Sequence, residues 1–259
     1  MGDPRATGAG LTLKLRRTFG DELRGVVLFG SVARGEEISG TSDLNILVLL
    51  ENMAPTRMAR IAPLVQEWVR GGNTPPHLYT VDEWQGMTDA FAIEIADMVD
   101  AREVVWGFDP VTPDAVTRED LRLHAEREIR QTLLQLRLRL LLSASMPKDI
   151  GNLLMSGMPS FTAYMRASLR VAGLEAPLDS AIVIERAAAL IDADPKPMLE
   201  CWQIRRTTRQ LAFAITDPVV ENYIGFVQQL LAFLDRAPET DSTNINLGAR
   251  EAPAAPAPH

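Results

Sequence analysis

Polar residues that suit phosphate chemistry follow the apolar stretch VVLF at residues 26–29. Gly30 and Ser31 come directly after this stretch, and Arg34 lies one helical turn further along. A glycine at such a position lets the backbone approach a ligand. The next backbone N–H groups and the serine hydroxyl can then hold phosphate oxygens. Arg34 can reach a triphosphate from the same turn. The pattern therefore predicts a phosphate-binding turn.

A second polar group, Asp43 and Asn45, opens the next apolar stretch. Residues that alternate along a strand place their side chains on one face, so these two side chains are expected to point the same way. A pair at this spacing can clamp a divalent metal ion that bridges phosphate oxygens. The two groups together predict a nucleotide site built from a turn and a strand.

The stretch LFGSVARGEEISGTSDLNILV, residues 28–48, resembles the signature of the DNA polymerase beta-type nucleotidyltransferase superfamily. That signature has a hydrophobic residue, Gly, Gly or Ser, a spacer, and then Asp-x-Asp/Glu between hydrophobic residues. Gly30, Ser31 and Asp43 match it. The variant most resembles bacterial nucleotidyltransferase domain proteins, the relatives of aminoglycoside nucleotidyltransferases and minimal nucleotidyltransferases. Those families often carry a C-terminal helical domain.

The resemblance implies transfer of a nucleotidyl group from an NTP to a hydroxyl, with Mg²⁺ (or Mn²⁺) held by two or three carboxylates. The third carboxylate of the family lies on a later strand, and Glu94 in FAIEIADM is the best match. On a strand Ile93 and Ile95 would point into the core and leave Glu94 on the opposite face. Asp97 would point to the other face. Glu94 can instead be a solvated strand residue or pair with an arginine.

Two sets of site residues follow from the resemblance. The nucleotide-binding set is Gly30, Ser31, Arg34 and Ser42. The catalytic and metal-binding set is Asp43, Asn45 and Glu94.

Asn45 departs from the family pattern, which has a carboxylate there. An amide oxygen can coordinate Mg²⁺ but brings no negative charge, so the metal affinity is expected to fall. Three interpretations stay open. Asn45 is a neutral ligand, or the site binds nucleotide without turnover, or Asn45 is a strand residue with no ligand role.

The elements that must position these residues alternate between strands and helices over residues 11–112. Apolar and alternating runs predict five strands, at 25–30, 42–50, 76–80, 91–98 and 102–107. Helical spacing predicts helices at 11–25 and 53–72, and SVARGEE predicts a helix or a single turn. Thr80 and Glu83 form a capping-box pattern that predicts a short helix. The expected fold is an α/β nucleotidyltransferase domain with a mixed sheet.

From residue 117 onward the sequence predicts helices alone. Thr117 and Asp120 cap a long amphipathic helix, and Asp217 and Pro218 form the N-cap and first position of the last one. We therefore expect a nucleotidyltransferase-fold domain at 1–115 and an all-α helical bundle at 116–237. The polar and then Pro/Ala-rich segment 238–259 is predicted to be a disordered tail.

Composition limits the class of protein. Apolar residues make up 46% of the 259 residues and charged residues 23%, as in a globular protein that builds a sizeable core. The net charge of −8 argues against a general nucleic-acid binder. The single cysteine, Cys201, rules out an internal disulfide and suits a reducing cytoplasm. No run is long and apolar enough for a membrane helix. Three scattered histidines, among them His77 and His124, give no zinc spacing and are interpreted as structural or exposed.

Two functions compete on these grounds. The first is an enzyme that transfers a nucleotidyl group to an unidentified small-molecule or protein acceptor. The second is a non-catalytic nucleotide-binding or interaction module that has lost a metal-binding carboxylate. The sequence leaves the acceptor, the preferred base and the oligomeric state open, including a homodimer.

Overall fold

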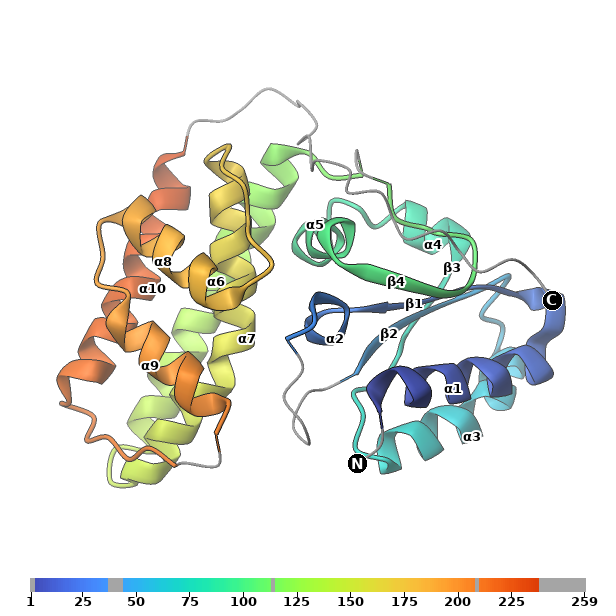
Figure 1. The fold of residues 1–259 in the computed structure, drawn as a ribbon, viewed down its shortest axis with the longest axis horizontal. Helices are drawn as coiled ribbons and strands as arrows, with labels where there is room; N and C mark the ends of the chain where they lie inside the picture. The colour runs from blue at the N-terminus through green and yellow to red at the C-terminus, as the bar shows by residue number, and fades with distance from the viewer. Residues whose placement is uncertain (1–2, 37–43, 113–114, 208–209, 238–259) are drawn as a thin grey trace. The chain divides into compact units, whose positions relative to one another are not determined.

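A computed structural model describes residues 3–36, 44–112, 115–207 and 210–237 of the protein. The chain forms two compact units. Among the described residues, the first unit runs up to Thr88 and resumes over Ile95–Ala115, and the second takes in Asp89–Glu94 and residues 116–237. The first unit is a sheet with helices and the second is helical, as Figure 1 shows. The predicted succession of an α/β fold and a helical region is confirmed.

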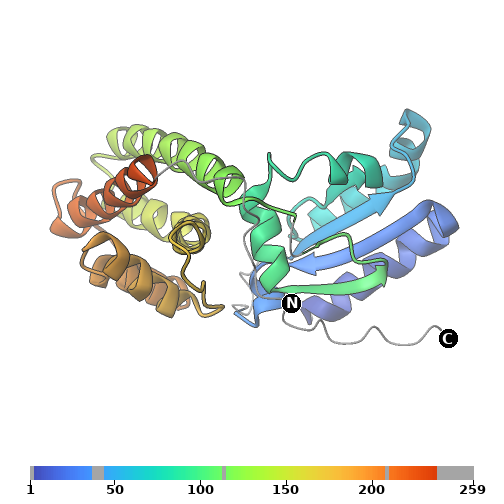
Figure 2. The same cartoon turned by 90° about the horizontal axis from the view of Figure 1, so that it is seen from above.

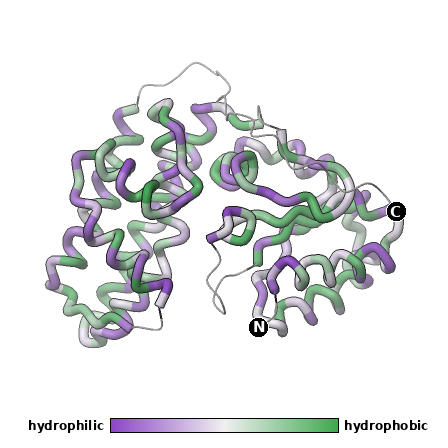
Figure 3. The backbone as a smooth tube through the Cα atoms, viewed as in Figure 1, coloured by the Kyte–Doolittle hydropathy of each residue, from purple (hydrophilic) through white to green (hydrophobic). Residues whose placement is uncertain are grey.

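The sheet of the first unit has four strands among the residues that the structure describes. They are β1 (Leu23–Phe29), β2 (Asn45–Leu50), β3 (His77–Thr80) and β4 (Arg102–Gly107). Their order is β3-β2-β1-β4. β1 runs antiparallel to both β2 and β4, whereas β2 and β3 are parallel, so the sheet is mixed, as predicted. The two central strands, β1 and β2, are almost wholly buried and stand out as hydrophobic in Figure 3.

Five α-helices of the described chain begin or lie in this part of the sequence. They are α1 (Pro4–Phe19), α2 (Ser31–Arg34), α3 (Pro55–Arg70), α4 (Val81–Gln85) and α5 (Ala92–Asp100), with a 3₁₀ turn, η1, at Gly20–Glu22. α1 and α3 lie side by side beneath the sheet in Figure 1, and Figure 2 shows the same elements from above.

Alternation along the strands divides the sheet into two faces. Leu28 of β1 and Ile46 of β2 join a buried cluster with Leu15 of α1 and Ile61 of α3. Neighbouring strand residues point to the opposite face. The register pairs Phe29 with Asn45 and Leu47 with His77, which places these four side chains on the face away from α1 and α3.

Local signals account for most of the element ends. Thr80 and Glu83 make the predicted capping box of α4. α1 begins before the predicted 11–25 because the Asp3 side chain accepts a hydrogen bond from the Arg5 N–H and Pro4 occupies the first turn. The helix ends at Phe19, before the predicted boundary at residue 25. Its C-cap is Gly20, whose φ of 52° suits glycine.

The strand predicted at 91–98 is wrong, because this segment forms α5. Its buried residues include Ala92, Ile95, Ala96 and Val99, which have the i, i+3, i+4, i+7 spacing of one helix face. The same short apolar run also fits, in part, the two-residue alternation of a strand. The sequence pattern therefore did not distinguish a helix from a strand. Glu94 therefore lies in the first turn of a helix and not on a strand.

The second unit is a bundle of long helices. They are α6 (Arg118–Leu142), α7 (Pro147–Val171), α8 (Ser180–Ile191), α9 (Lys196–Arg205) and α10 (Pro218–Arg236). α7 packs against each of the other four. Thr117 and Asp120 make the predicted capping box of α6, and Asp217 caps α10 with Pro218 in its first turn, as predicted.

No helix within the described residues is long and apolar enough to cross a membrane.

Candidate functional site

The turn between β1 and α2 has a backbone that requires glycine. Gly30 has φ 77° and ψ −147°, a region that side chains with a Cβ hardly populate. A Cβ added to Gly30 would lie 2.6 Å from Nδ2 of Asn45, a contact too short for carbon and nitrogen. The turn thus packs directly against the first residue of β2. This contact follows from the pairing of Phe29 with Asn45 at the ends of the two central strands.

Ser31 is the first residue of α2, which is a single turn. The Gly35 N–H donates to the Val32 carbonyl at 3.2 Å and the Glu36 N–H donates to the Ser31 carbonyl at 2.9 Å. These bonds fold the chain back on itself directly after the helix. The first N–H groups of a helix have no acceptor within it. Ser31, with its hydroxyl, thus stands at the start of α2, where backbone N–H groups have no acceptor within the helix; its role in binding phosphate stays a prediction.

Arg34, at the end of α2, is held by two carboxylates. Its Nε donates to Oε2 of Glu36 at 3.3 Å, and its Nη1 lies 3.5 Å from Oδ2 of Asp97 on α5. The three side chains are only 13%, 9% and 13% exposed, respectively. The sequence predicts that Arg34 reaches a triphosphate and that Asp97 points to the face opposite Glu94, away from the metal site. The structure instead brings the two residues together, because α5 is a helix that turns Asp97 toward α2.

Of the two metal-binding residues predicted on the second strand, Asp43 and Asn45, the structure describes only Asn45. Asn45 begins β2 and is partly exposed beside Gly30. Asp43 and Ser42 lie outside the described residues. Asn45 thus has the predicted place, at the end of a central strand and next to the turn.

Glu94 lies in the second unit, on the first turn of α5, and is 41% exposed. Its Oε2 is 4.0 Å from Nδ1 of His124 on α6. The prediction of a strand carboxylate aligned with Asn45 rested on the wrong period for 91–98.

His124 is buried and caps α5 rather than acting as a surface residue. The Ile93 N–H donates to Nδ1 of His124 at 3.3 Å, which requires Nδ1 to be unprotonated. Burial lowers the pKa of His124, although Glu128 beside it acts in the opposite direction. The neutral ring therefore satisfies one of the free N–H groups at the start of a helix. This role is structural, as expected for a histidine in a long helix.

The sequence offers no reason to place His77 near the candidate site, and the residue is interpreted as structural or exposed. It begins β3 and pairs with Leu47, so it lies on the sheet face of Phe29 and Asn45. The rings of His77 and Phe29 meet edge to face with centroids 5.3 Å apart. Burial lowers the pKa of His77, which favours a neutral imidazole. Only the strand register could have found it, because no spacing in the sequence links His77 with Asn45.

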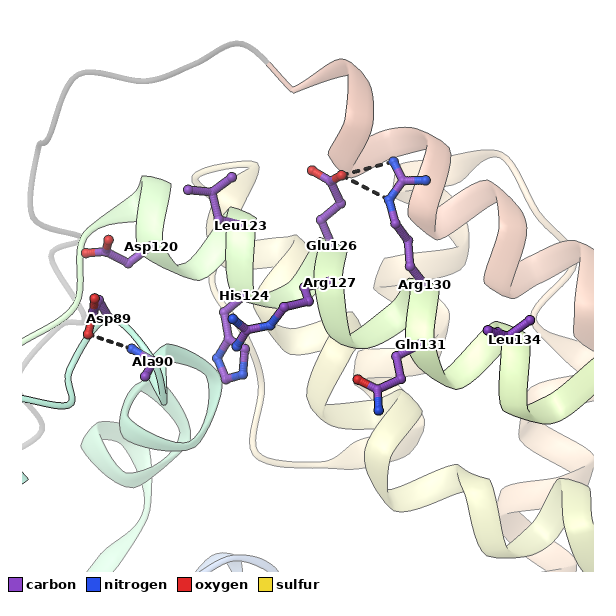
Figure 4. A pocket seen from close by; sticks show the side chains of 10 residues that line it. All are labelled: Asp89, Ala90, Asp120, Leu123, His124, Glu126, Arg127, Arg130, Gln131 and Leu134. Carbon is purple, nitrogen blue, oxygen red and sulfur yellow. Dashed lines mark hydrogen bonds and ion pairs between the residues drawn. The ribbon is translucent and has the colours of Figure 1, made fainter.

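A cavity of about 780 Å³ opens along α6 in the second unit (Figure 4). Its charged side chains already have partners within the second unit. Arg130 donates to Glu126 at 3.0 Å and also pairs with Asp235 of α10, and Arg127 lies 3.7 Å from Glu128. We therefore assign this cavity no part in nucleotide chemistry.

The described residues around the turn supply a neutral amide ligand for Mg²⁺, but their carboxylate is already engaged by an arginine. Asn45 offers an amide oxygen, whereas the carboxylate of Asp97 is engaged by Arg34. Outside the gap at 37–43 and the other undescribed segments, no three His, Cys, Asp or Glu residues are grouped so that they could hold a metal ion. The charged ligand that the sequence predicts, Asp43, falls within that gap.

A mixed sheet whose first hairpin joins a glycine-serine turn to a polar strand end defines a nucleotidyltransferase fold. Residues 13–141 match the family model of the nucleotidyltransferase domain. This part of the chain is thus a nucleotidyltransferase domain of the DNA polymerase beta-type superfamily, as the sequence motif predicts.

One solved structure has a similar fold over most of the chain. The chain is similar to the spectinomycin adenyltransferase AAD(9) from Enterococcus faecialis, solved with ATP and spectinomycin. The identity is 14% and the TM-score 0.53, over 89% of this chain and 99% of that one. A toxin-antitoxin structure with AMP-PNP matches 53% of this chain and 98% of its own, at 18% identity and a TM-score of 0.28. At these identities the likeness concerns the fold. A comparison with curated proteins gives no match.

Proposed function

We propose that the protein transfers a nucleotidyl group from an NTP to a hydroxyl of an acceptor. The nucleotidyltransferase domain at residues 13–141 supports this class of reaction. The observation that carries it furthest is the contact of Gly30 with Asn45. It brings the proposed phosphate-binding turn next to Asn45, the described member of the proposed metal-binding pair, which supports the proposal.

The residues have distinct roles in this proposal. The backbone N–H groups that follow Gly30 and the hydroxyl of Ser31 bind phosphate oxygens, and Ser42, which lies outside the described residues, assists them. Asp43 and Asn45 hold Mg²⁺ or Mn²⁺, which when bound neutralises phosphate charge. Catalysis then rests on positioning and on charge neutralisation at the phosphate. Glu94 has no part in this scheme, because it lies on α5 beside His124.

The acceptor belongs to the proposal and is a hydroxyl-bearing small molecule or protein. The adenyltransferase with a similar fold was solved with ATP and spectinomycin, so ATP and an aminocyclitol are the first pair to test. Because the identity is only 14%, this choice sets the order of the assays and not the substrate.

Asn45 favours a second candidate, a nucleotide-binding module without turnover. The amide gives the metal site one negative charge less than a carboxylate at this position, and hard cations prefer carboxylates. Nucleotide binding through the turn does not depend on that charge to the same degree. The two candidates therefore share a binding step and differ in the release of pyrophosphate.

The test combines calorimetry with an assay of pyrophosphate release. ATP, GTP, CTP and UTP are titrated with and without Mg²⁺ or Mn²⁺, and each is then incubated with candidate acceptors. We expect binding and acceptor-dependent pyrophosphate release that Ser31→Ala weakens. The control is Ser156→Ala, because the Ser156 hydroxyl only bonds the Leu153 carbonyl within α7. Binding without release favours the second candidate, and no binding at millimolar nucleotide overturns both.

A further inference from the structure

A buried charged cluster links the glycine-serine turn to α5. Arg34 ends the helical turn that Ser31 begins, and its guanidinium lies between Glu36 and Asp97. All three side chains are at most 13% exposed. A guanidinium has five donors in a fixed plane, so a carboxylate on either side fixes its orientation. The position of Arg34 is thus set by the protein itself.

The cluster joins segments that are distant in the sequence. Glu36 follows α2 directly and its N–H donates to the Ser31 carbonyl. Asp97 lies on α5, which comes after strands β2 and β3 in the sequence. Arg34 therefore holds the C-terminal end of α2 between Glu36, which follows that helix, and Asp97 of α5; we call these three residues the clamp. Because the Glu36 N–H bonds the Ser31 carbonyl, a shift of the clamp is expected to shift the backbone of Ser31, three residues before Arg34.

We infer that Arg34 is a positioning residue that holds the phosphate-binding turn through Glu36 and Asp97, and is not itself a phosphate ligand. The inference rests on the proposed function, because it assumes that the turn at Gly30 and Ser31 binds nucleotide. A positioning role predicts that removing either partner of the clamp weakens nucleotide binding. A ligand role predicts the opposite for Asp97, because its carboxylate competes with phosphate for the guanidinium.

The experiment compares Arg34→Gln, Asp97→Asn and the double variant with the wild type by calorimetry, with ATP, ADP and AMP. We expect each single variant to lose about tenfold in affinity. The double variant should lose little more than either single one, because the two residues act as one unit. The loss should be similar for all three nucleotides. Arg34→Lys keeps the charge without the planar fork and should recover part of the affinity.

The fitted stoichiometry separates positioning from simple destabilisation. A variant that is only less stable has fewer competent molecules, so its stoichiometry falls while the Kd of the folded fraction stays at the wild-type value. A displaced turn changes the Kd at full stoichiometry. The matched control is Arg24→Gln, which removes an exposed pair with Glu51 in the same unit and should leave nucleotide affinity unchanged.

The outcomes are distinct for the inference and for the proposed function. If the wild type binds nucleotide and Asp97→Asn binds equally or more tightly, while Arg34→Gln loses most with ATP and least with AMP, Arg34 is a phosphate ligand and the inference is overturned. A loss of stoichiometry at unchanged Kd also overturns it. If the wild type binds no nucleotide, the proposed function fails and the inference fails with it.

Discussion

Gly30 and Asn45 lie in such close contact that a methyl group on Gly30 would be 2.6 Å from the Asn45 amide nitrogen. Gly30→Ala is expected to cost about 3 kcal/mol of unfolding free energy, because this backbone region is nearly exclusive to glycine and the contact adds a clash. Gly35→Ala is the control. Gly35 also has a positive φ, of 74°, but a Cβ there meets no atom of the described residues within 4 Å. It should cost about 1 kcal/mol. Equal losses in urea unfolding would show that the contact with Asn45 is unimportant.

Asn45→Asp is expected to strengthen Mn²⁺-dependent nucleotide binding. The substitution adds a carboxylate to the strand end that the sequence predicts to carry Asp43 on the same face. Without metal it should lower the stability of the protein, since the two carboxylates then repel each other. The measurement is NTP affinity as a function of Mn²⁺. Asp43→Asn should weaken binding in the same titration. If the wild type and both variants bind alike, these residues do not hold a metal ion.

His124 predicts a loss of stability at mildly acidic pH. Its pKa is lowered by burial in the folded protein, so the unfolded chain takes up the proton first. Stability is therefore complete above the unfolded pKa of about 6.5 and is lost as the pH falls from there toward the folded pKa. One histidine contributes a slope of at most about 1.4 kcal/mol per pH unit. Glu94, Glu128 and Arg127 are the charged groups around the ring.

The test of this prediction is urea unfolding at pH 7 and at pH 5.5. His124→Gln keeps an acceptor for the Ile93 N–H but does not titrate, so it should reduce the difference between the two pH values. His77→Gln is the parallel variant, because burial lowers that pKa as well. An unchanged difference in the His124 variant would mean that this histidine does not control the acid sensitivity.

Cys201 is expected to react with a thiol reagent only when the helical unit unfolds. It is fully buried on α9, and burial raises its pKa to about 12, with the charge of Glu200 adding to the effect. The reactive thiolate is therefore scarce and inaccessible at neutral pH. The measurement is the rate of modification against urea concentration. Fast modification in native buffer, with unchanged circular dichroism, would contradict the burial of this side chain.

Truncation after residue 237 is expected to leave the unfolding midpoint unchanged. The segment 238–259 lies outside the described residues, and its sequence has too little apolar surface to offset the entropy of ordering. A fragment of residues 1–115 should aggregate, because the start of α5 then loses His124, which accepts a hydrogen bond from the Ile93 N–H. A soluble fragment with cooperative unfolding would show that the first domain is independent.

The sequence by itself determined the elements whose signals are local. The runs that became β1 and β2 are mostly apolar, and the capping boxes at Thr80 and Thr117 lie within four residues of chain. The motif with Gly30 and Ser31 likewise identified the superfamily, because its residues follow one another along a single hairpin. Such signals depend on backbone dihedral angles and short-range hydrogen bonds, which a few neighbouring residues fix.

Only the tertiary structure decided which distant residues meet. The helical form of α5 brought Asp97 to Arg34, and the parallel register of β2 and β3 placed His77 on the face of Asn45. A short apolar segment such as 91–98 fits two periods, and packing against the rest of the protein selects one of them. Strand register cannot be read from local spacing. The same holds for the ion pair of Arg34 with Asp97, which are more than sixty residues apart. The physical reason is that these contacts depend on the whole folded core.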